Sequence, residues 1–414
     1  MTNVLIIGFV WPEPKSSAAG SRMMQLIEAF QSQNFQITFA SPSSKSERGA
    51  DLKVLGIREE TIALNNSSFD VFLNELQPNI VLFDRFLMEE QFGWRVTEHC
   101  PDALKILDTE DLHCLRKGRQ QAYKDKATFN DDYLFNEFAK REIASIYRCD
   151  VSLMISEVEI DILTQKFKVP KNLLLYIPFM CDSISEIEQK SLPDFLDREH
   201  VVTIGNFLHE PNYQSVLYLK QTLWPLIKKQ LPKAEIHVYG AYASQKVNQL
   251  HQPKDRFYIK GFADDVNEVM KHAKICMAPL VFGAGLKGKL VDAMINGTPC
   301  AMSSIAAEGM FGAQEPNGFI ADDVEEFVAK TTELYTNKTL WTKKQDHGFK
   351  SFNSRFNKSY FQQQFLAYIV YLQTHLKSHR LHNFTGTLLQ HHSMQSTKFM
   401  SRWIEEKNKH TSTT

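Results

Sequence analysis

The amino-acid sequence predicts an α/β protein of two doubly wound domains that face each other across a cleft, followed by a long helix and a tail. Short β-branched apolar segments alternate with helical patterns along most of the chain, which is typical of a parallel sheet covered by helices on both faces. A polar stretch interrupts the series once, and the same pattern then restarts. The 414 residues are long enough for two such domains.

The first domain is expected over residues 1–182. Apolar spacing of three and four residues, as in Met23, Leu26 and Phe30, indicates helices between its strands. The expected strands are the near-continuous apolar segments 4–10, 36–40, 79–84, 104–108 and 151–156.

The second domain is expected over residues 200–354. Residues 183–199, which precede it, are polar, contain Pro193 and show no strand pattern, so they are predicted to be an interdomain linker. Helical segments again alternate with strands, which are expected at 200–207, 234–240, 256–262, 273–280 and 299–303. Ligands of such domains bind outside the carboxyl ends of the strands, which places a site in the cleft.

The last part of the chain differs from both domains. Residues 355–376 are expected to form a long helix, and residues 377–414 form a tail rich in histidine and basic residues. A helical apolar face in this tail can pack against the protein or lie on an anionic membrane, and we expect packing. Its members are Phe399, Met400, Trp403 and Ile404.

The composition excludes several classes of protein. A formal charge of −1 argues against general nucleic-acid binding, because proteins that follow the phosphate backbone carry an excess of lysine and arginine. The six cysteines form no C-x-x-C pair, so neither a zinc site nor a disulfide framework is indicated, and a cytoplasmic location is expected. A signal-peptide pattern and an apolar run of about 18 residues are both missing, so at most peripheral membrane contact is expected.

One loop carries the strongest sign of function. Gly283 and Gly285 follow the buried strand 273–280, and Lys287 and Lys289 stand at the start of the next helix. Glycine lets a ligand approach the backbone closely, and the amino end of a helix carries partial positive charge. With two lysines beside it, this loop is suited to bind a diphosphate group.

Weaker signals follow other strands. Gly20 lies in the first helix, where it permits either close approach of a ligand or tight packing of the helix. Glu308 follows the strand 299–303 and can serve either as a helix cap or as a ligand contact.

The segment 107–119 gathers acids, a histidine and arginines directly after a strand. Carboxylates at this spacing can hold a divalent metal, but the sequence contains only this one acid cluster, so we expect no metal. The other interpretation is a polar cluster at the edge of the cleft, in which His113 donates a hydrogen bond to a substrate oxygen.

Motifs of other enzyme classes are missing from the sequence. The chain has no Walker A loop, no G-x-G-x-x-G after strand 4–10 and no ordered Ser–His–Asp signal. Nucleoside triphosphatases, nicotinamide enzymes and hydrolases are therefore disfavoured.

With these segments the sequence resembles the GT-B glycosyltransferases, and among them the retaining family GT4, which includes sucrose and glycogen synthases. The donor-site signature of that family is similar to GAGLKGKLVDAMINGTPCAMSSIAAEGM (283–310). The start of its second domain is similar to IGNFLHEPNYQSVLYLKQTLWPLI (204–227), and its histidine-bearing strand end to LDTEDLHCLR (107–116). The likeness covers roughly residues 1–375 in layout.

The resemblance implies two Rossmann-like domains, a nucleotide-diphosphate sugar held mainly by the second, an acceptor held by the first, and no obligatory metal. Carried over by position, Lys287 meets the diphosphate, Asp292 the ribose and His113 the transferring sugar, with His113 and Lys287 in catalytic roles. The helix at 355–376 would cross back to the first domain. Further donor contacts are implied at Gly20, Gly205, Asn206, Gly283, Gly285, Lys289 and Glu308.

The sequence departs from the family pattern in two places. Many members carry two glutamates eight positions apart, whereas this chain has Ala284 and Asp292 there. Many members also have an arginine and a lysine at the start of the second domain, where this chain has Asn206 and Pro211. The charge that meets the diphosphate must then come from the lysines at the loop 283–289.

The expected function is retaining, metal-independent transfer of a hexose from a nucleotide-diphosphate sugar to a glycan or lipid-linked acceptor, as in polysaccharide biosynthesis. Two alternatives stay open. A sugar-nucleotide epimerase on the same fold would need a catalytic acid and base, for which His113 and Glu308 are the candidates. A non-catalytic protein that binds a nucleotide-sugar would fit the departures at Ala284, Asn206 and Pro211.

Overall fold

The computed structural model describes residues 2–411, which form two α/β domains with a parallel sheet in each. The first sheet consists of β1 (Asn3–Ile7), β2 (Gln36–Ser41), β3 (Arg58–Thr61), β4 (Ile80–Asp84), β5 (Leu104–Asp108), β6 (Val151–Met154) and β7 (Leu174–Tyr176). The second consists of β8 (His200–Ile204), β9 (Ile236–Tyr239), β10 (Phe257–Gly261), β11 (Ala273–Ala278), β12 (Cys300–Met302) and β13 (Gly318–Ile320).

Both sheets reverse their strand order beside their first strand. The first runs β3-β2-β1-β4-β5-β6-β7 and the second β10-β9-β8-β11-β12-β13. In doubly wound sheets ligands bind outside the carboxyl ends of the strands at such a switch point. The loops after β1 and β4 flank this point in the first domain, and those after β8 and β11 flank it in the second.

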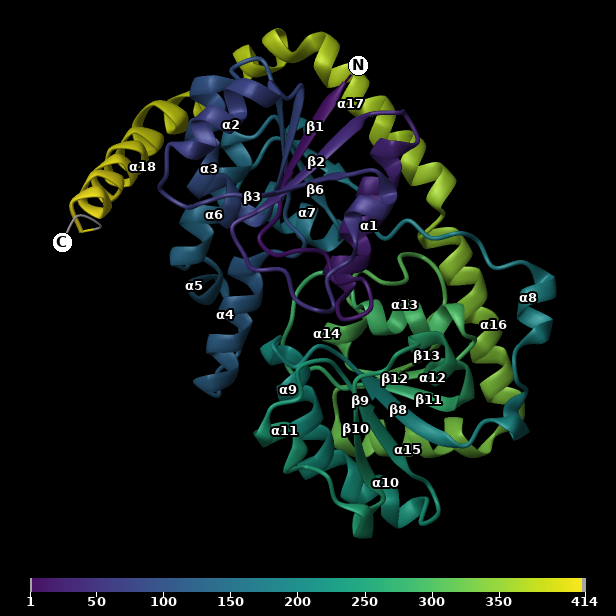
Figure 1. Ribbon diagram of the computed structural model, residues 1–414. Helices are drawn as coiled ribbons and strands as arrows, with labels where there is room; N and C mark the ends of the chain where they lie inside the picture. Colours follow the sequence, from purple (N-terminus) through teal and green to yellow (C-terminus); the bar gives the residue numbers. More distant parts are fainter. Residues whose placement is uncertain (1, 412–414) are drawn as a thin grey trace.

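Helices cover both faces of each sheet (Figure 1). Those of the first domain are α1 (Ala18–Gln31), α2 (Ser68–Leu76), α3 (Arg85–His99), α4 (His113–Lys124), α5 (Asp131–Leu134), α6 (Glu137–Arg148) and α7 (Glu157–Gln165). The linker contains α8 (Glu186–Ser191), and the second domain contains α9 (Glu210–Tyr218), α10 (Trp224–Gln230), α11 (Gln245–Asn248), α12 (Val266–His272), α13 (Gly288–Ile295), α14 (Ser304–Ala307), α15 (Val324–Thr336) and α16 (Lys338–Arg355).

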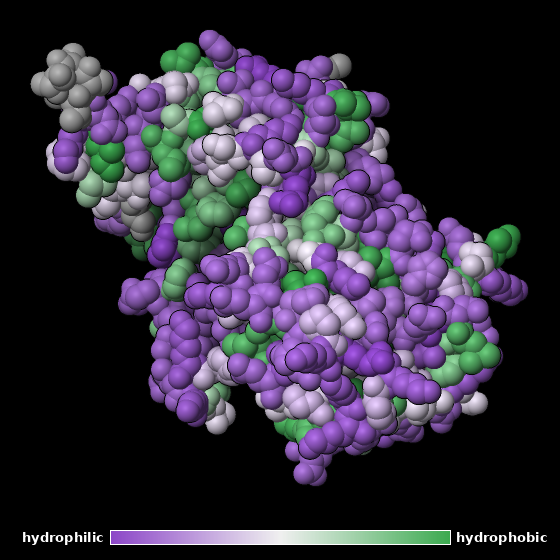
Figure 2. Space-filling view, turned by 60° about the horizontal axis from the view of Figure 1, so that its bottom comes forward, coloured by the Kyte–Doolittle hydropathy of each residue, from purple (hydrophilic) through white to green (hydrophobic). Residues whose placement is uncertain are grey.

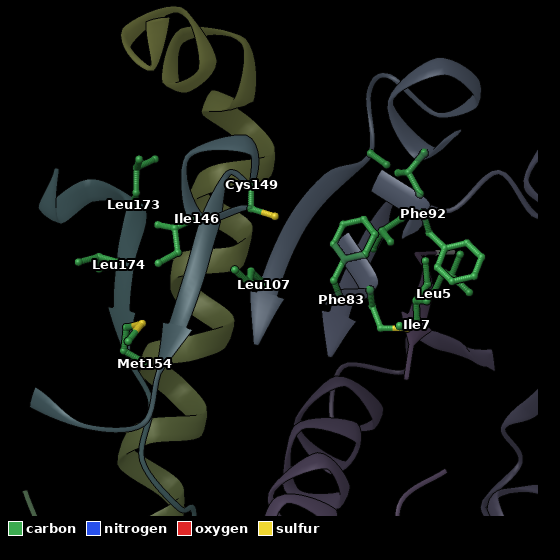
Figure 3. Packing of buried hydrophobic residues seen from close by; sticks show 14 of the residues in the cluster. Leu5, Ile7, Phe83, Phe92, Leu107, Ile146, Cys149, Met154, Leu173 and Leu174 are labelled. Atoms are coloured by element: carbon green, nitrogen blue, oxygen red, sulfur yellow. The ribbon is translucent and has the colours of Figure 1, made fainter. Parts of the chain in front are cut away.

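Side chains of the first sheet alternate between two apolar cores. Leu5 and Ile7 of β1 point into the core shown in Figure 3, whereas Val4 and Ile6 point into the core on the other side of the sheet. All four side chains are almost completely buried. Burial of both faces explains why the strands read as continuous apolar segments in the sequence.

The chain passes between the two domains twice, and the two connecting segments lie side by side. The Cys181 N–H donates to the Phe356 carbonyl at 2.7 Å, and the Lys358 N–H donates to the Cys181 carbonyl at 2.9 Å. After this point α17 (Lys358–His382) crosses back to the first domain (Figure 1). Its residues Phe365 and Ile369 are buried in the core that also contains Phe30.

The C-terminal region is more helical than the sequence analysis expected. The helix predicted at 355–376 extends to His382, and α18 (Phe384–Thr411) follows after Asn383, where a tail was expected. α18 packs against α3 and α6 of the first domain. Between residues 2 and 411, every helix is too short or too polar to cross a lipid bilayer.

Candidate functional site

The loop between β11 and α13, residues 279–287, together with the first turn of α13, places both predicted lysines at one end of the second sheet; we call residues 279–289 the lysine loop. Lys287 occupies the N-cap position of α13 and is 8% exposed. Its Nζ donates to the carbonyl oxygens of Ala284 at 3.0 Å and Gly285 at 2.5 Å. The Lys289 Nζ donates to Asn212 Oδ1 at 3.1 Å.

Both lysines carry a charge that their surroundings compensate poorly. Removal from water lowers the pKa of Lys287 and of Lys289 to about 8 each, although Glu308 favours the charged form of the first and Asp292 that of the second. Each ammonium group donates to neutral oxygens in the bonds described above. An anionic ligand would supply the missing negative charge.

Both predicted glycines of the lysine loop contact the first domain, and Gly285 is required for the close approach. Gly285 has a φ of +64°, and a Cβ there would lie 2.9 Å from the Asp111 Cβ in the first domain. Its N–H donates to Glu159 Oε1 of α7 at 2.8 Å. The Gly283 carbonyl accepts a hydrogen bond of 2.9 Å from Arg119 Nη1 of α4.

Glu308 at the end of α14 also contacts the first domain. Its Oε1 and Oε2 accept hydrogen bonds from Arg119 Nη1 and Nη2 at 2.9 and 2.8 Å. Of the two sequence interpretations, the N-terminal helix cap is not observed: the Ser303 side chain caps the start of α14, and Glu308 stands at the C-cap position after its last residue. Glu308 also acts electrostatically on Lys287, which places the two groups at one site.

His113 begins α4 and is held by acids on both sides. Its N–H donates to Glu142 Oε1 at 2.9 Å, and its Nδ1 lies 3.1 Å from the Asp111 carbonyl oxygen. The ring packs edge-on against Phe86 with centroids 5.3 Å apart, and the residue is 9% exposed. Asp111 in turn binds Arg116 Nε at 2.7 Å, and this pair holds the pKa of Asp111 well below its usual range despite burial.

Of the other two acids of the segment 107–119, Asp108 is buried and Glu110 is partly buried, and Asp108 acts electrostatically on Glu110. Asp108 binds Arg22 Nη2 at 3.1 Å, and burial raises the pKa of Asp108. Burial and the neighbouring Asp108 raise the pKa of Glu110, whose Oε1 has no hydrogen-bond partner. Within the described part of the chain, no three histidine, cysteine, aspartate or glutamate side chains are grouped to hold a metal ion.

Two further residues predicted to bind the donor, Gly205 and Asn206, contact the side chain of Asn212. A Cβ on Gly205 would lie 2.6 Å from Asn212 Cγ, and the Asn206 carbonyl accepts from Asn212 Nδ2 at 3.0 Å. Asn212 Oδ1 accepts from Lys289. The loop after β8 and the lysine loop, which flank the switch point of the second sheet, are therefore joined through one side chain.

Gly20 and Asp292 occupy different surroundings. A Cβ on Gly20 would lie 2.4 Å from the Glu13 carbonyl carbon, so the structure explains this glycine by packing of α1 on its own loop. Asp292 lies in α13 one turn after the two lysines, and burial raises its pKa to about 7 against the effect of Lys289. Asp292 also acts electrostatically on Cys181 at the domain crossing.

Several residues at this site were missed by the sequence analysis. Glu159 and Arg119 reach the lysine loop from the first domain. His209, at the N-cap of α9, is solvent-exposed but shares its electrostatic environment with Asp111 and the two lysines. Two of them had a sequence signal: Arg119 ends the polar segment 107–119, and His209 follows the strand end Gly205–Asn206 and precedes a helix.

Residues 198–337 match the family model described as glycosyl transferases group 1. A curated relative from Klebsiella pneumoniae, called an uncharacterized 44.6 kDa protein in the cps region, is 22% identical over 254 residues. These residues cover 55% of this chain and 59% of that relative. The matched family region contains the lysine loop, Asp292 and Glu308.

Solved structures with the same architecture cover about nine-tenths of the chain. TarM from S. aureus, in complex with Fondaparinux, alpha-GlcNAc-glycerol and UDP, is 11% identical with a TM-score of 0.67, covering 89% of this chain and 99% of its own. Sucrose-phosphate synthase from Thermosynechococcus elongatus is 14% identical with a TM-score of 0.67, covering 90% and 99%. HepE from Anabaena, in complex with UDP-glucose, is 13% identical with a TM-score of 0.67, covering 90% and 100%.

The fold expected from the sequence is therefore confirmed. These solved structures superpose on 89–90% of this chain over almost their own full length, and this chain has two parallel sheets. The chain has the GT-B fold, and residues 198–337 match the model of the glycosyl transferases group 1.

Proposed function

We propose that this protein is a retaining glycosyltransferase that moves a hexose from a nucleotide-diphosphate sugar to a glycan or lipid-linked acceptor. The observation that carries the proposal is the position of the lysine loop. It lies inside the group 1 glycosyltransferase match, at the switch point of the second sheet, and presents one buried and one partly buried lysine at the start of a helix. HepE, which shares the fold, binds UDP-glucose in its solved complex.

The proposed chemistry follows from the charge at this loop. When the sugar leaves, negative charge grows on the departing nucleotide diphosphate, and preorganised positive groups stabilise it most where water is excluded. Lys287, Lys289 and the amino end of α13 would supply that charge, so the proposal requires no metal. Retention of the anomeric configuration is proposed from the resemblance to family GT4.

The first domain would hold the transferring sugar and the acceptor. His113 is fixed through Nδ1 by the Asp111 carbonyl, so its Nε2 is the ring nitrogen assigned to the sugar. Asp292, whose pKa is raised to about 7, is assigned to the ribose. All six cysteines are free and five are buried, which supports a reducing compartment such as the cytoplasm.

A non-catalytic nucleotide-sugar binding protein is the second candidate. It is favoured by Ala284, which stands where many family members carry a glutamate and which packs into the core of the first domain. An epimerase receives less support, because Glu308 is bound by Arg119 and not available as a free acid or base.

The deciding experiment measures hydrolysis and transfer across a panel of nucleotide-diphosphate sugars. The proposal expects turnover of at least one donor, with Lys287→Ala as the control that removes it. Tight binding of a donor without turnover by the wild-type protein would favour the non-catalytic candidate. Release of an epimerised nucleotide-sugar would identify the third possibility.

A further inference from the structure

The outer face of α18 exposes a stripe of large apolar side chains. The spacing of this stripe is four, eleven and four residues, so its members lie on one side of the helix. They are between 47% and 73% exposed, and Met400 beside them is 58% exposed. We call this surface the α18 stripe; it consists of Phe384, Leu388, Phe399 and Trp403.

The opposite face of α18 attaches the helix to the first domain through small and polar residues. A Cβ on Gly386 would lie 2.1 Å from the Tyr147 carbonyl oxygen of α6, and Gln390 Nε2 donates to the Arg148 carbonyl at 2.9 Å. Met394 is 7% exposed, and Glu405 Oε1 accepts from the Ser67 N–H at 3.0 Å.

The sequence expectation that Phe399, Met400 and Trp403 pack against the protein is therefore wrong. Close contact through Gly386 and hydrogen bonds from polar side chains turn the apolar side of the helix outward. Ile404, the fourth member of the expected face, is partly buried. Figure 2 shows hydrophobic residues at the surface of the upper-left lobe, where α18 runs in Figure 1.

The part of the chain that carries the α18 stripe has more basic than acidic residues. From residue 358 to residue 411 the chain contains seven lysine and arginine residues and two acidic residues, Glu405 and Glu406. Four of these cations form ion pairs with acids of the first domain: Lys358 with Glu28, Arg380 with Asp150, and both Lys398 and Arg402 with Glu98. Three cations of α18 stay exposed to solvent: Arg402, which also pairs with Glu98, Lys407, and Lys409, which also pairs with Glu406.

We propose that the α18 stripe binds the interfacial region of an anionic membrane. A helix that lies in the interface places aromatic and aliphatic side chains among the acyl chains and its cations on the headgroups, which is the arrangement found here. Trp403 and Phe399 supply the interfacial anchors, and Arg402 lies beside them.

A second copy of the chain is a poorer occupant of this surface. Two copies that met through their α18 stripes would bring like-charged neighbourhoods together, which opposes association. The membrane proposal does not depend on the proposed glycosyltransferase activity. If both hold, a lipid-linked acceptor becomes the preferred substrate class.

Trp403 makes the proposal directly measurable. It is 60% exposed, whereas the other four tryptophans are at most 5% exposed. The full-length protein is mixed with vesicles of phosphatidylcholine alone or with added phosphatidylglycerol. The proposal expects a blue shift of tryptophan emission and protection from acrylamide with the anionic vesicles only, both weakened by salt. The four buried tryptophans are Trp11, Trp94, Trp224 and Trp341.

Two double variants distinguish membrane binding by the α18 stripe from nonspecific hydrophobic binding. Phe399→Ser combined with Trp403→Ser should weaken vesicle sedimentation roughly tenfold or more, since a buried aromatic side chain contributes about that factor. Ile187→Ser combined with Leu196→Ser, which alters equally exposed apolar residues of the linker, should not change it. Equal binding by both double variants, or equal binding to neutral vesicles, would overturn the proposal. In the absence of vesicles, protection of Trp403 from acrylamide that increases with protein concentration would indicate that a second copy of the chain covers the α18 stripe. This result would also overturn the membrane proposal.

Discussion

Arg119 of the first domain binds Glu308 of the second through two hydrogen bonds, Nη1 to Oε1 at 2.9 Å and Nη2 to Oε2 at 2.8 Å. The same Nη1 donates to the Gly283 carbonyl at 2.9 Å. A bidentate arginine–carboxylate pair fixes both the distance and the orientation of its partners. Because Gly283 and Glu308 adjoin Lys287, this contact links the position of the first domain to the geometry of the lysine loop.

The first prediction concerns this interdomain pair. Arg119→Ala and Glu308→Ala should each favour an open arrangement, visible as a larger radius of gyration in small-angle scattering. The double variant should be no more open than either single variant, with a coupling energy of about 1–3 kcal/mol in donor affinity. Arg141→Ala is the matched control, because Arg141 forms a similar pair with Glu90 inside the first domain. Additive effects of the two substitutions would contradict the coupling.

The second prediction concerns Lys287. Lys287→Ala should lower kcat by roughly 10²- to 10³-fold, which is typical for the loss of one preorganised charge-stabilising group. The melting temperature should change little, because the substitution also removes the cost of a buried ammonium group. Lys246→Ala, in α11 of the same domain, controls for a general loss of positive charge. Wild-type turnover in the Lys287→Ala protein would remove the residue from the mechanism.

The fold could be predicted from the sequence because both faces of the central strands are buried. Continuous apolar segments such as 104–108 correspond to strands with every residue buried, as in β5. The strands that were missed lack this signal. β3 has the sequence Arg-Glu-Glu-Thr at the edge of the first sheet, and β7 and β13 are three-residue edge strands.

From the sequence, a residue could be assigned to the site only where it comes soon after a predicted strand. The lysine loop and His113 come directly after β11 and β5, so the carboxyl-edge rule places them at the right ends of their sheets. Arg119 and Glu159 act through contacts between residues 126 or more positions apart, which local patterns do not encode. Gly285 was interpreted as room for a ligand, whereas in the structure Asp111 occupies that position.

A third prediction follows from the lowered pKa of the two lysines. Lys287 and Lys289 are cations below about pH 8 and become neutral above it. The kcat/KM for the donor, which reports groups of the free enzyme, should therefore fall as the pH rises through about 8. Replacing both lysines by arginine, which stays charged across this range, should remove that fall. An unchanged alkaline limb in the arginine variant would assign the titration to another group.

The fourth prediction concerns metal ions. If the lysines and the amino end of α13 carry the charge of the leaving group, EDTA should leave transfer nearly unchanged. Two acids of the segment 107–119 bind arginines, Asp108 with Arg22 and Asp111 with Arg116. Activity that disappears with EDTA and returns with Mn²⁺ would show instead that these carboxylates bind metal during the reaction.

The last prediction concerns Glu159, which accepts hydrogen bonds from the Leu112 N–H at 3.0 Å and the Gly285 N–H at 2.8 Å while completely buried. Burial, reinforced by Asp111, raises its pKa from 4.5 to about 8. The folded protein therefore holds a proton that the unfolded chain releases above about pH 4.5. The stability associated with this proton is fully present below pH 4.5 and is lost as the pH rises through about 8.

Glu159→Gln keeps an oxygen for both N–H groups but has no titrating proton. The melting temperature of the variant should match that of the wild type near pH 4.5 and should exceed it increasingly up to about pH 8. A difference between Glu159→Gln and wild type that stays constant with pH would mean that Glu159 is ionised in the folded protein, and the two N–H groups would then be bound by a carboxylate.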